Sequence, residues 1–158
     1  MAPAYNSDFP QQKRKQMIPA TKKRVLIIED DAEIRNSFVM IVNSSQKFGV
    51  VNSYGNCEDA IKHLAQDKPD YVLMDIELPG QDGITTTRQL LTANPTARVL
   101  MVTGYDDADM RNAATAAGAC GYVLKENLQE LRHWFQVINT IETTYSTHLP
   151  AAEKGKNR

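Results

Sequence analysis

The segment Arg24-Val25-Leu26-Ile27-Ile28-Glu29-Asp30-Asp31 joins a short apolar run to an abrupt acidic end. The run does not alternate between apolar and polar residues, so it is typical of a strand that is covered on both faces. Such strands occur in parallel sheets with helices on both sides. A helical pattern follows directly, and Asp31 is the predicted N-cap of that helix. This strand-to-helix transition predicts an α/β fold.

Four more strand–helix pairs follow along the chain. Short β-branched runs alternate with longer helical patterns, which is the signature of a parallel sheet with right-handed crossovers. The first helix should contain about 15 residues. The later strands are predicted at 48–51, 71–74, 98–102 and 120–124, and the later helices at 56–65, 84–93, 107–117 and 128–143. The sequence therefore predicts a single domain over residues 23–145, a (βα)5 doubly wound five-stranded parallel sheet.

Composition narrows the class of protein. The chain has 158 residues, of which 42% are hydrophobic and 23% charged, as is ordinary for a globular domain. No apolar run approaches the roughly 20 residues of a membrane span, and the first residues lack the apolar stretch of a signal peptide. Cys57 and Cys120 lack metal-type spacing, so reduced thiols are expected. These features predict a cytoplasmic protein with no membrane association.

Charge is unevenly distributed. Residues 25–150 carry 9 basic and 17 acidic side chains, whereas the two ends are basic. We expect a disordered basic N-terminal tail over residues 1–22 and a flexible C-terminal tail over 146–158, with no output domain in that short remainder. An acidic globule does not favour direct contact with DNA, because nucleic-acid-binding surfaces are basic.

Polar side chains end four of the five predicted strands. They are Glu29 with Asp30, then Asp75, Thr103 and Lys125. The carboxyl ends of parallel strands meet at one edge of the sheet, where ligands bind in this architecture. Grouped carboxylates repel one another unless a cation intervenes, and Mg²⁺ prefers oxygen ligands. A carboxylate, a divalent ion, a hydroxyl and an amine form a minimal set for making an aspartyl phosphate.

The chain carries four motifs in this order: Val25-Leu26-Ile27-Ile28-Glu29-Asp30-Asp31, Met74-Asp75-Ile76-Glu77-Leu78-Pro79-Gly80-Gln81-Asp82-Gly83, Val102-Thr103-Gly104 and Gly121-Tyr122-Val123-Leu124-Lys125. Together they resemble the response regulator receiver domains of two-component signalling, the CheY-like family. The resemblance covers about residues 23–145 and implies the flavodoxin-like strand order 2-1-3-4-5. Lys125 is followed by Glu126 where the family often has proline, which resembles receivers that precede a NarL/LuxR-type helix-turn-helix domain.

The resemblance implies a phosphoacceptor and a metal site. Asp75 would accept the phosphoryl group. Asp30 and Asp75 would contact Mg²⁺ directly, with Mn²⁺ as a substitute, and Glu29 would act through water. The backbone carbonyl of Glu77 would supply a further metal ligand.

The same resemblance assigns the phosphoryl-binding and switch residues. The Thr103 hydroxyl and the Lys125 ammonium would hold phosphoryl oxygens. Movement of Thr103 toward the phosphoryl group would leave room for the Tyr122 ring, so that the face of helix 4, strand 5 and helix 5 repacks. Glu77 and Tyr105 flank the pocket at positions that tune the lifetime of the phosphoryl group.

The implied partners are a sensor histidine kinase or a phosphotransfer protein, and a downstream protein or a DNA-binding output domain outside this chain. The last predicted helix has a wide apolar arc that includes Trp134, Val137 and Ile141. Either deep burial or a partner or dimer face explains such an arc. A phosphorylation-dependent homodimer is therefore one interpretation.

Three other classes compete with this reading. A haloacid-dehalogenase-like phosphatase uses similar groups, but its second Asp would stand where Glu77 stands, and no cap domain is visible. A receiver-like interaction module independent of phosphorylation usually lacks one of the acids or the lysine, and all are present here. A flavodoxin relative would need Gly, Ser and Thr in the first loop. The sequence favours a switch that catalyses only its own phosphorylation and dephosphorylation.

Overall fold

Residues 17–148 are described by the computed structural model, in which five strands and five helices alternate. The strands form one parallel sheet in the order β2-β1-β3-β4-β5. This confirms the predicted α/β fold and the strand order implied by the resemblance. The elements are β1 (Lys23–Ile28), α1 (Ala32–Asn43), β2 (Phe48–Tyr54), α2 (Cys57–Asp67), β3 (Tyr71–Met74), α3 (Gly83–Ala93), β4 (Arg98–Thr103), α4 (Ala108–Ala116), β5 (Gly121–Leu124) and α5 (Leu128–His148).

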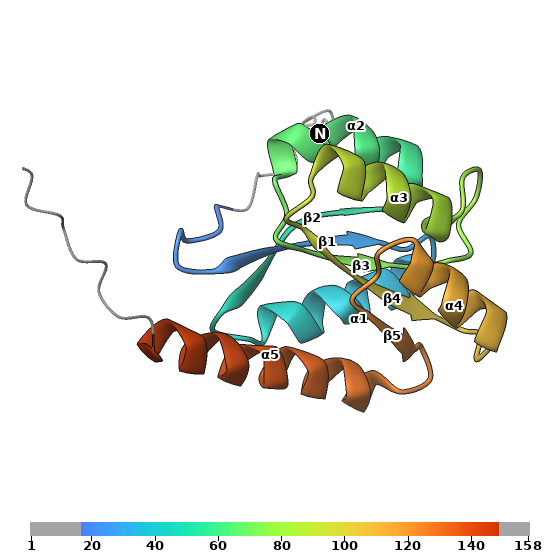
Figure 1. The fold of residues 1–158 in the computed structure, drawn as a ribbon. Helices are drawn as coiled ribbons and strands as arrows, with labels where there is room; N and C mark the ends of the chain where they lie inside the picture. Colours follow the sequence, from blue (N-terminus) through green and yellow to red (C-terminus); the bar gives the residue numbers. More distant parts are fainter. Residues whose placement is uncertain (1–16, 149–158) are drawn as a thin grey trace, which may run out of the picture.

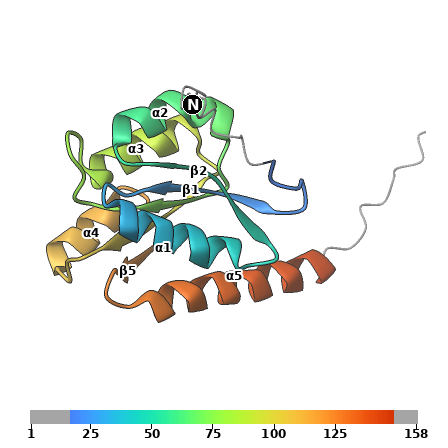
Figure 2. The same ribbon diagram turned by 180° about the vertical axis from the view of Figure 1, so that it is seen from behind.

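Helices cover both faces of the sheet (Figures 1 and 2). α1 and α5 lie on one face, where one core cluster includes Phe38, Val42 and Phe135. α2, α3 and α4 cover the other face, where a second cluster includes Leu64 and Leu90. The central strands are therefore buried on both sides, which is the physical reason for their unbroken apolar runs.

Polar caps fix where the helices begin. The Asp31 carboxylate accepts hydrogen bonds from the backbone N–H groups of Glu33 and Ile34, as predicted for an N-cap. Asp107 caps α4 in the same way, so that helix begins one residue later than predicted. After α4, Gly118 adopts a φ of +102°, a left-handed conformation that ends the helix as expected.

Three elements differ most in length from the sequence expectation. β2 extends to Tyr54 because Asn52, Ser53 and Tyr54 pair with β1 through their backbones, although Asn52 and Ser53 give no apolar signal. α1 contains 12 residues rather than about 15. It ends at Asn43, whose side chain accepts a hydrogen bond from the Val50 N–H. α5 continues to His148, beyond the predicted end at Thr143.

The segment before β1 belongs partly to the folded structure. Residues 17–22 contain a turn closed by a hydrogen bond from the Lys22 N–H to the Pro19 carbonyl, and Ile18 packs against the core. The rest of the predicted N-terminal tail (1–16), like residues 149–158, lies outside the described residues. Every peptide bond over residues 17–148 is trans, including the one between Lys125 and Glu126. In the same range, no helix is both long and apolar enough to cross a membrane.

Candidate phosphoryl and metal site

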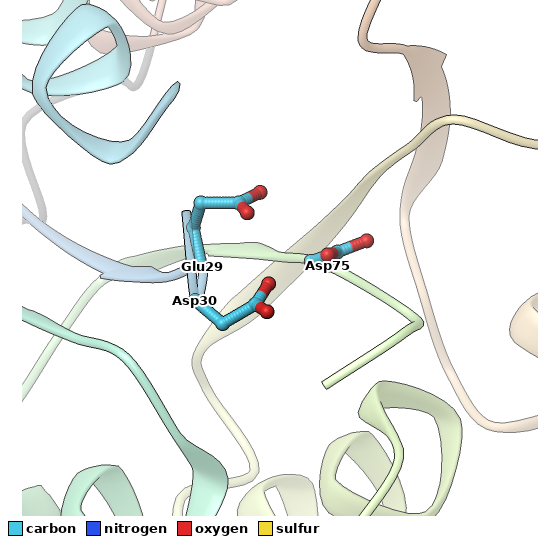
Figure 3. Close-up of side chains that lie close together, drawn as sticks. All are labelled: Glu29, Asp30 and Asp75. Carbon is cyan, nitrogen blue, oxygen red and sulfur yellow. The ribbon is translucent and has the colours of Figure 1, made fainter. Parts of the chain in front are cut away.

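Three carboxylates meet beyond the ends of the two central strands. Glu29 and Asp30 follow β1, and Asp75 follows β3, which is hydrogen-bonded beside β1. One oxygen from each of these groups lies within 4.8 Å of the others. Figure 3 shows that the three side chains extend toward the same side of the sheet edge. Glu29 and Asp75 are buried, with exposed fractions of 0% and 3%, whereas Asp30 is open to solvent.

A single ammonium group neutralises part of this cluster. Nζ of Lys125 lies 2.8 Å from Oδ2 of Asp75 and 2.7 Å from Oε2 of Glu29. The Glu29 contact is an ion pair more than a well-directed hydrogen bond, because that oxygen has no aligned donor. Burial alone would lower the pKa of Lys125, but its contacts with the Asp75 and Glu29 carboxylates raise that pKa above its ordinary value.

The carboxylates remain costly to ionise despite Lys125. Burial raises the pKa of Asp75, although the hydrogen bond from Lys125 and those from the backbone N–H groups of Glu77 and Ile76 act in the opposite direction. Burial likewise raises the pKa of Glu29. The single positive charge of Lys125 does not balance the negative charges of the three carboxylates, which repel one another. A hard divalent cation, whose preferred ligands are oxygens, would supply the missing positive charge. The donor set therefore fits Mg²⁺.

The loop after Asp75 is held by a very close backbone approach. A Cβ atom on Gly83 would overlap the carbonyl oxygen of Asp75, so only glycine fits at the first position of α3. The Gly83 N–H donates a 2.9 Å hydrogen bond to the Ile76 carbonyl. The Gln81 N–H donates to the Glu58 carboxylate on α2. These contacts fix the segment that carries Glu77, whose side chain is exposed.

Thr103 supplies a hydroxyl group at the end of β4. Its side chain is completely buried, and Oγ1 has no hydrogen-bond partner among the described residues. The Lys125 N–H donates a 2.8 Å hydrogen bond to the Thr103 carbonyl, which brings these two strand ends together. A buried hydroxyl without a partner costs free energy, and a polar ligand group in the pocket would remove that cost.

Two tyrosines border the site through the loop between β4 and α4. The Tyr122 hydroxyl, from β5, donates a 2.7 Å hydrogen bond to the backbone carbonyl of Tyr105. The Glu77 carboxylate lies beside the Tyr105 phenol and raises the pKa of Tyr105, and the charge of Asp75 acts in the same direction. Tyr105 is 48% exposed. Tyr105 and Glu77, the two positions that flank the predicted pocket, are therefore neighbours in the fold.

The apolar arc of α5 is divided between core and surface. Trp134 is half-buried and makes edge-to-face ring contacts with Tyr71 and Phe135. Val137 and Ile141 remain 38% and 48% exposed. Trp134 thus contributes to packing on the sheet, while the two aliphatic residues stay available at the surface.

Sequence reasoning did not identify two arginines near the site. Nη1 of Arg35, on α1, donates hydrogen bonds to the backbone carbonyls of Glu29 (2.6 Å) and Asp30 (3.2 Å), so it fixes the acidic pair. Its place one turn after the Asp31 cap is a signal that could have been noticed. Arg111, on α4, lies over the Tyr122 ring. No pattern in the sequence marks that contact.

Comparison with known proteins identifies the family. Residues 25–136 match the family model of the response regulator receiver domain. The chain is 30% identical to the oxygen regulatory protein NreC of Staphylococcus carnosus, over 77% of this chain and 54% of that protein. It is 31% identical to the uncharacterized transcriptional regulatory protein YxjL of Bacillus subtilis, over 69% of this chain and 50% of that protein. The chain thus spans about half the length of these curated relatives.

A solved structure gives the same answer. The two-component response regulator of the LuxR family from Aurantimonas sp. SI85-9A1 superposes with a TM-score of 0.69 at 28% identity, covering 74% of this chain and 84% of that one. The chain belongs to the response regulator receiver domain family.

Proposed function

We propose that this receiver domain is a phosphoryl-accepting switch in which Asp75 takes a phosphoryl group from the phosphohistidine of a sensor histidine kinase or phosphotransfer protein. A carboxylate oxygen of Asp75 attacks phosphorus, and the phosphorus–nitrogen bond of the donor breaks. The departing nitrogen keeps the electron pair, and one proton from solvent leaves the imidazole neutral. A small acyl phosphate donates in the same way, with a carboxylate as leaving group.

The observation that carries this proposal is the pairing of Lys125 with Asp75 beside the unpartnered hydroxyl of Thr103. Transfer of a phosphoryl group needs mainly positioning and compensation of charge. When Asp75 becomes an acyl phosphate, its Lys125 contact can pass to a phosphoryl oxygen. Thr103 can then donate its hydroxyl hydrogen to a second phosphoryl oxygen.

The acidic cluster would hold Mg²⁺, with Mn²⁺ as a substitute. Asp30 and Asp75 would be direct ligands, Glu29 would act through water, and the Glu77 carbonyl would complete the protein ligands. The ion, when bound, supplies positive charge that offsets the charge of the phosphoryl oxygens. Arg35 supports the site by fixing the carbonyls of Glu29 and Asp30.

The output follows from the contacts around Tyr122. A hydrogen bond from Thr103 to the phosphoryl group would change the packing near Tyr122, and with it the face formed by α4, β5 and α5. That face, or the exposed residues Val137 and Ile141 of α5, would then bind a downstream protein, an output domain or a second copy. Membership in this family supports a role in the cytoplasm.

Binding of beryllofluoride, a phosphoryl mimic, tests this function by calorimetry. We expect tight binding only when Mg²⁺ is present, and loss of binding in Asp75→Ala. Asp109→Asn, which changes an exposed carboxylate on α4, should bind like the natural chain. Equal binding by Asp75→Ala and the natural chain would overturn the proposal and leave a phosphorylation-independent interaction module.

A further inference from the structure

Arg111 connects Tyr122 to the loop between β4 and α4. Its guanidinium carbon lies 4.4 Å from the centre of the Tyr122 ring, which is a cation–π contact. The same guanidinium donates through Nε (2.9 Å) and Nη2 (2.8 Å) to Oδ1 of Asp106. Asp106 follows Tyr105, whose carbonyl accepts the hydrogen bond from the Tyr122 hydroxyl. One side chain therefore covers the ring and is anchored to the loop that the ring contacts.

These contacts define one position of Tyr122. We call it the docked position: the hydroxyl is bonded to the Tyr105 carbonyl, and the ring lies between the core beside β4 and the Arg111 guanidinium. In any other rotamer the hydroxyl would leave that carbonyl and the ring would leave the cation. Both contacts therefore favour the docked position, and they act on opposite ends of the same side chain.

We propose that Arg111 is a positioning residue that holds Tyr122 in the docked position before any phosphoryl group is bound. The inference rests on the proposed function, because it gives Arg111 a role only through the switch tyrosine. In this proposal the docked position is the one that favours phosphoryl binding, so its population in the resting protein sets the apparent affinity for a phosphoryl mimic. Arg111 then lowers the conformational cost of switching without touching the phosphoryl group.

The anchoring of Arg111 separates this role from that of an ordinary surface cation. A free arginine would lose side-chain entropy on stacking over a ring, whereas Arg111 is already oriented by two donors on one carboxylate oxygen. Asp107 lies next to Asp106 but caps α4, so its carboxylate is engaged with the Met110 N–H. Asp106 is therefore the carboxylate that directs Arg111.

Fluorine NMR of protein labelled with 3-fluorotyrosine measures the docked population directly. The Tyr122 resonance is assigned by its loss in Tyr122→Phe. We expect Arg111→Gln to lower the ratio of docked to undocked Tyr122 by about two- to five-fold, the size of an exposed cation–π contact. Beryllofluoride with Mg²⁺ should bind this variant more weakly, by at most the same factor. The exposed Arg88→Gln on α3 is the matched control and should change neither quantity.

A double-mutant cycle shows whether the effect passes through Tyr122. In a Tyr122→Ala background, Arg111→Gln should leave beryllofluoride affinity unchanged. The inference would be overturned if Arg111→Gln weakened beryllofluoride binding equally in the Tyr122→Ala background. It would also be overturned if the ratio of docked to undocked Tyr122 in Arg111→Gln equalled that of the natural chain. If Arg111→Gln does not fold, Asp106→Ala, which removes only the anchor, must lower the ratio of docked to undocked Tyr122 in the same direction. Failure of the natural chain to bind beryllofluoride would instead overturn the proposed function. The ratio of docked to undocked Tyr122, measured by NMR, would still show whether Arg111 holds Tyr122 in the docked position.

Discussion

Lys125 Nζ lies 2.8 Å from Asp75 Oδ2, and this contact joins the carboxyl ends of β5 and β3 across β4. The same ammonium also faces Oε2 of Glu29 at 2.7 Å. One positive charge therefore serves two buried carboxylates, with Asp30 close by. The site is arranged for a further positive charge and for phosphoryl oxygens, and several of its properties can be measured separately.

The pH dependence of stability should report the cost of ionising Asp75. Because the folded pKa of Asp75 is raised above its ordinary value of 3.8, the folded state binds more protons than the unfolded state just above that pH. The ionised side chain therefore lowers the free energy of unfolding progressively as pH rises through the folded pKa. The loss is about 1.4 kcal/mol for each pH unit that separates the folded pKa from the unfolded one. Asp75→Asn removes this loss.

Urea unfolding of both proteins without divalent cations, from pH 4 to pH 7, measures the difference. The stability of Asp75→Asn relative to the natural chain should grow with pH and reach a plateau. Added Mg²⁺ should reduce the difference, since it stabilises only the chain that binds it well. A difference that is constant, or that shrinks with rising pH, would show that the carboxylate is not destabilised by burial.

The Thr103 hydroxyl should be dispensable for folding but not for phosphoryl binding. Thr103→Val removes a buried hydroxyl that has no partner and should leave the free energy of unfolding unchanged or raise it by about 1 kcal/mol. Beryllofluoride affinity should fall, because a phosphoryl oxygen loses its donor. Thr87→Val is the matched variant. Its buried hydroxyl donates a 2.7 Å hydrogen bond to the Gly83 carbonyl, so it should destabilise the fold by about 1 kcal/mol. Similar destabilisation by both would contradict this distinction.

The ring of Tyr105, beside Glu77, should slow loss of the phosphoryl group. Tyr105 stands beside the acidic site, and removal of its ring admits water. Tyr105→Ala should shorten the lifetime of the phosphorylated protein by about two- to ten-fold, a modest change in barrier. Tyr105→Phe keeps the ring and loses only the hydroxyl beside Glu77, so its lifetime should fall between those of the natural chain and Tyr105→Ala. Decay of the phosphorylated mass after removal of the donor gives each rate, and an unchanged lifetime in Tyr105→Ala counts against shielding.

The exposed part of α5 should carry any phosphorylation-dependent pairing. Ile141→Asp places a charge on a residue that is 48% exposed, so the free energy of unfolding should change by less than about 0.5 kcal/mol. Light scattering after size-exclusion chromatography should show the phosphorylated natural chain as a dimer and the variant as a monomer. Ala65→Asp, on α2 across the sheet, should still pair. Pairing that survives Ile141→Asp would place the interface elsewhere.

The fold could be predicted from the sequence because each buried strand is a short apolar run. The capping residues, such as Asp31 before α1, add local signals for where the helices begin or end. It was less informative for β2, where Asn52 and Ser53 pair at the sheet edge through their backbones and need no apolar side chain. The strand ends were likewise readable as the place where Asp75, Thr103 and Lys125 should meet.

Other features of the site depend on rotamers and loop paths that a sequence pattern does not encode. The shared use of Lys125 by Asp75 and Glu29 is one example, since spacing gives the strand ends but not which charges touch. The stacking of Arg111 on Tyr122 is another, because it needs both the start of α4 and the course of the preceding loop. The overlap that a Cβ on Gly83 would make with Asp75 also appears only in three dimensions.

Intact-protein mass after incubation with acetyl phosphate tests the central claim most directly. The natural chain, compared with and without Mg²⁺ and beside Asp75→Ala, should gain the mass of one phosphoryl group only with Mg²⁺. The added group should be lost at alkaline pH, as an acyl phosphate is, and Asp75→Ala should gain nothing. An unchanged mass in the natural chain, or an equal gain in Asp75→Ala, would contradict the assignment of Asp75 as phosphoacceptor.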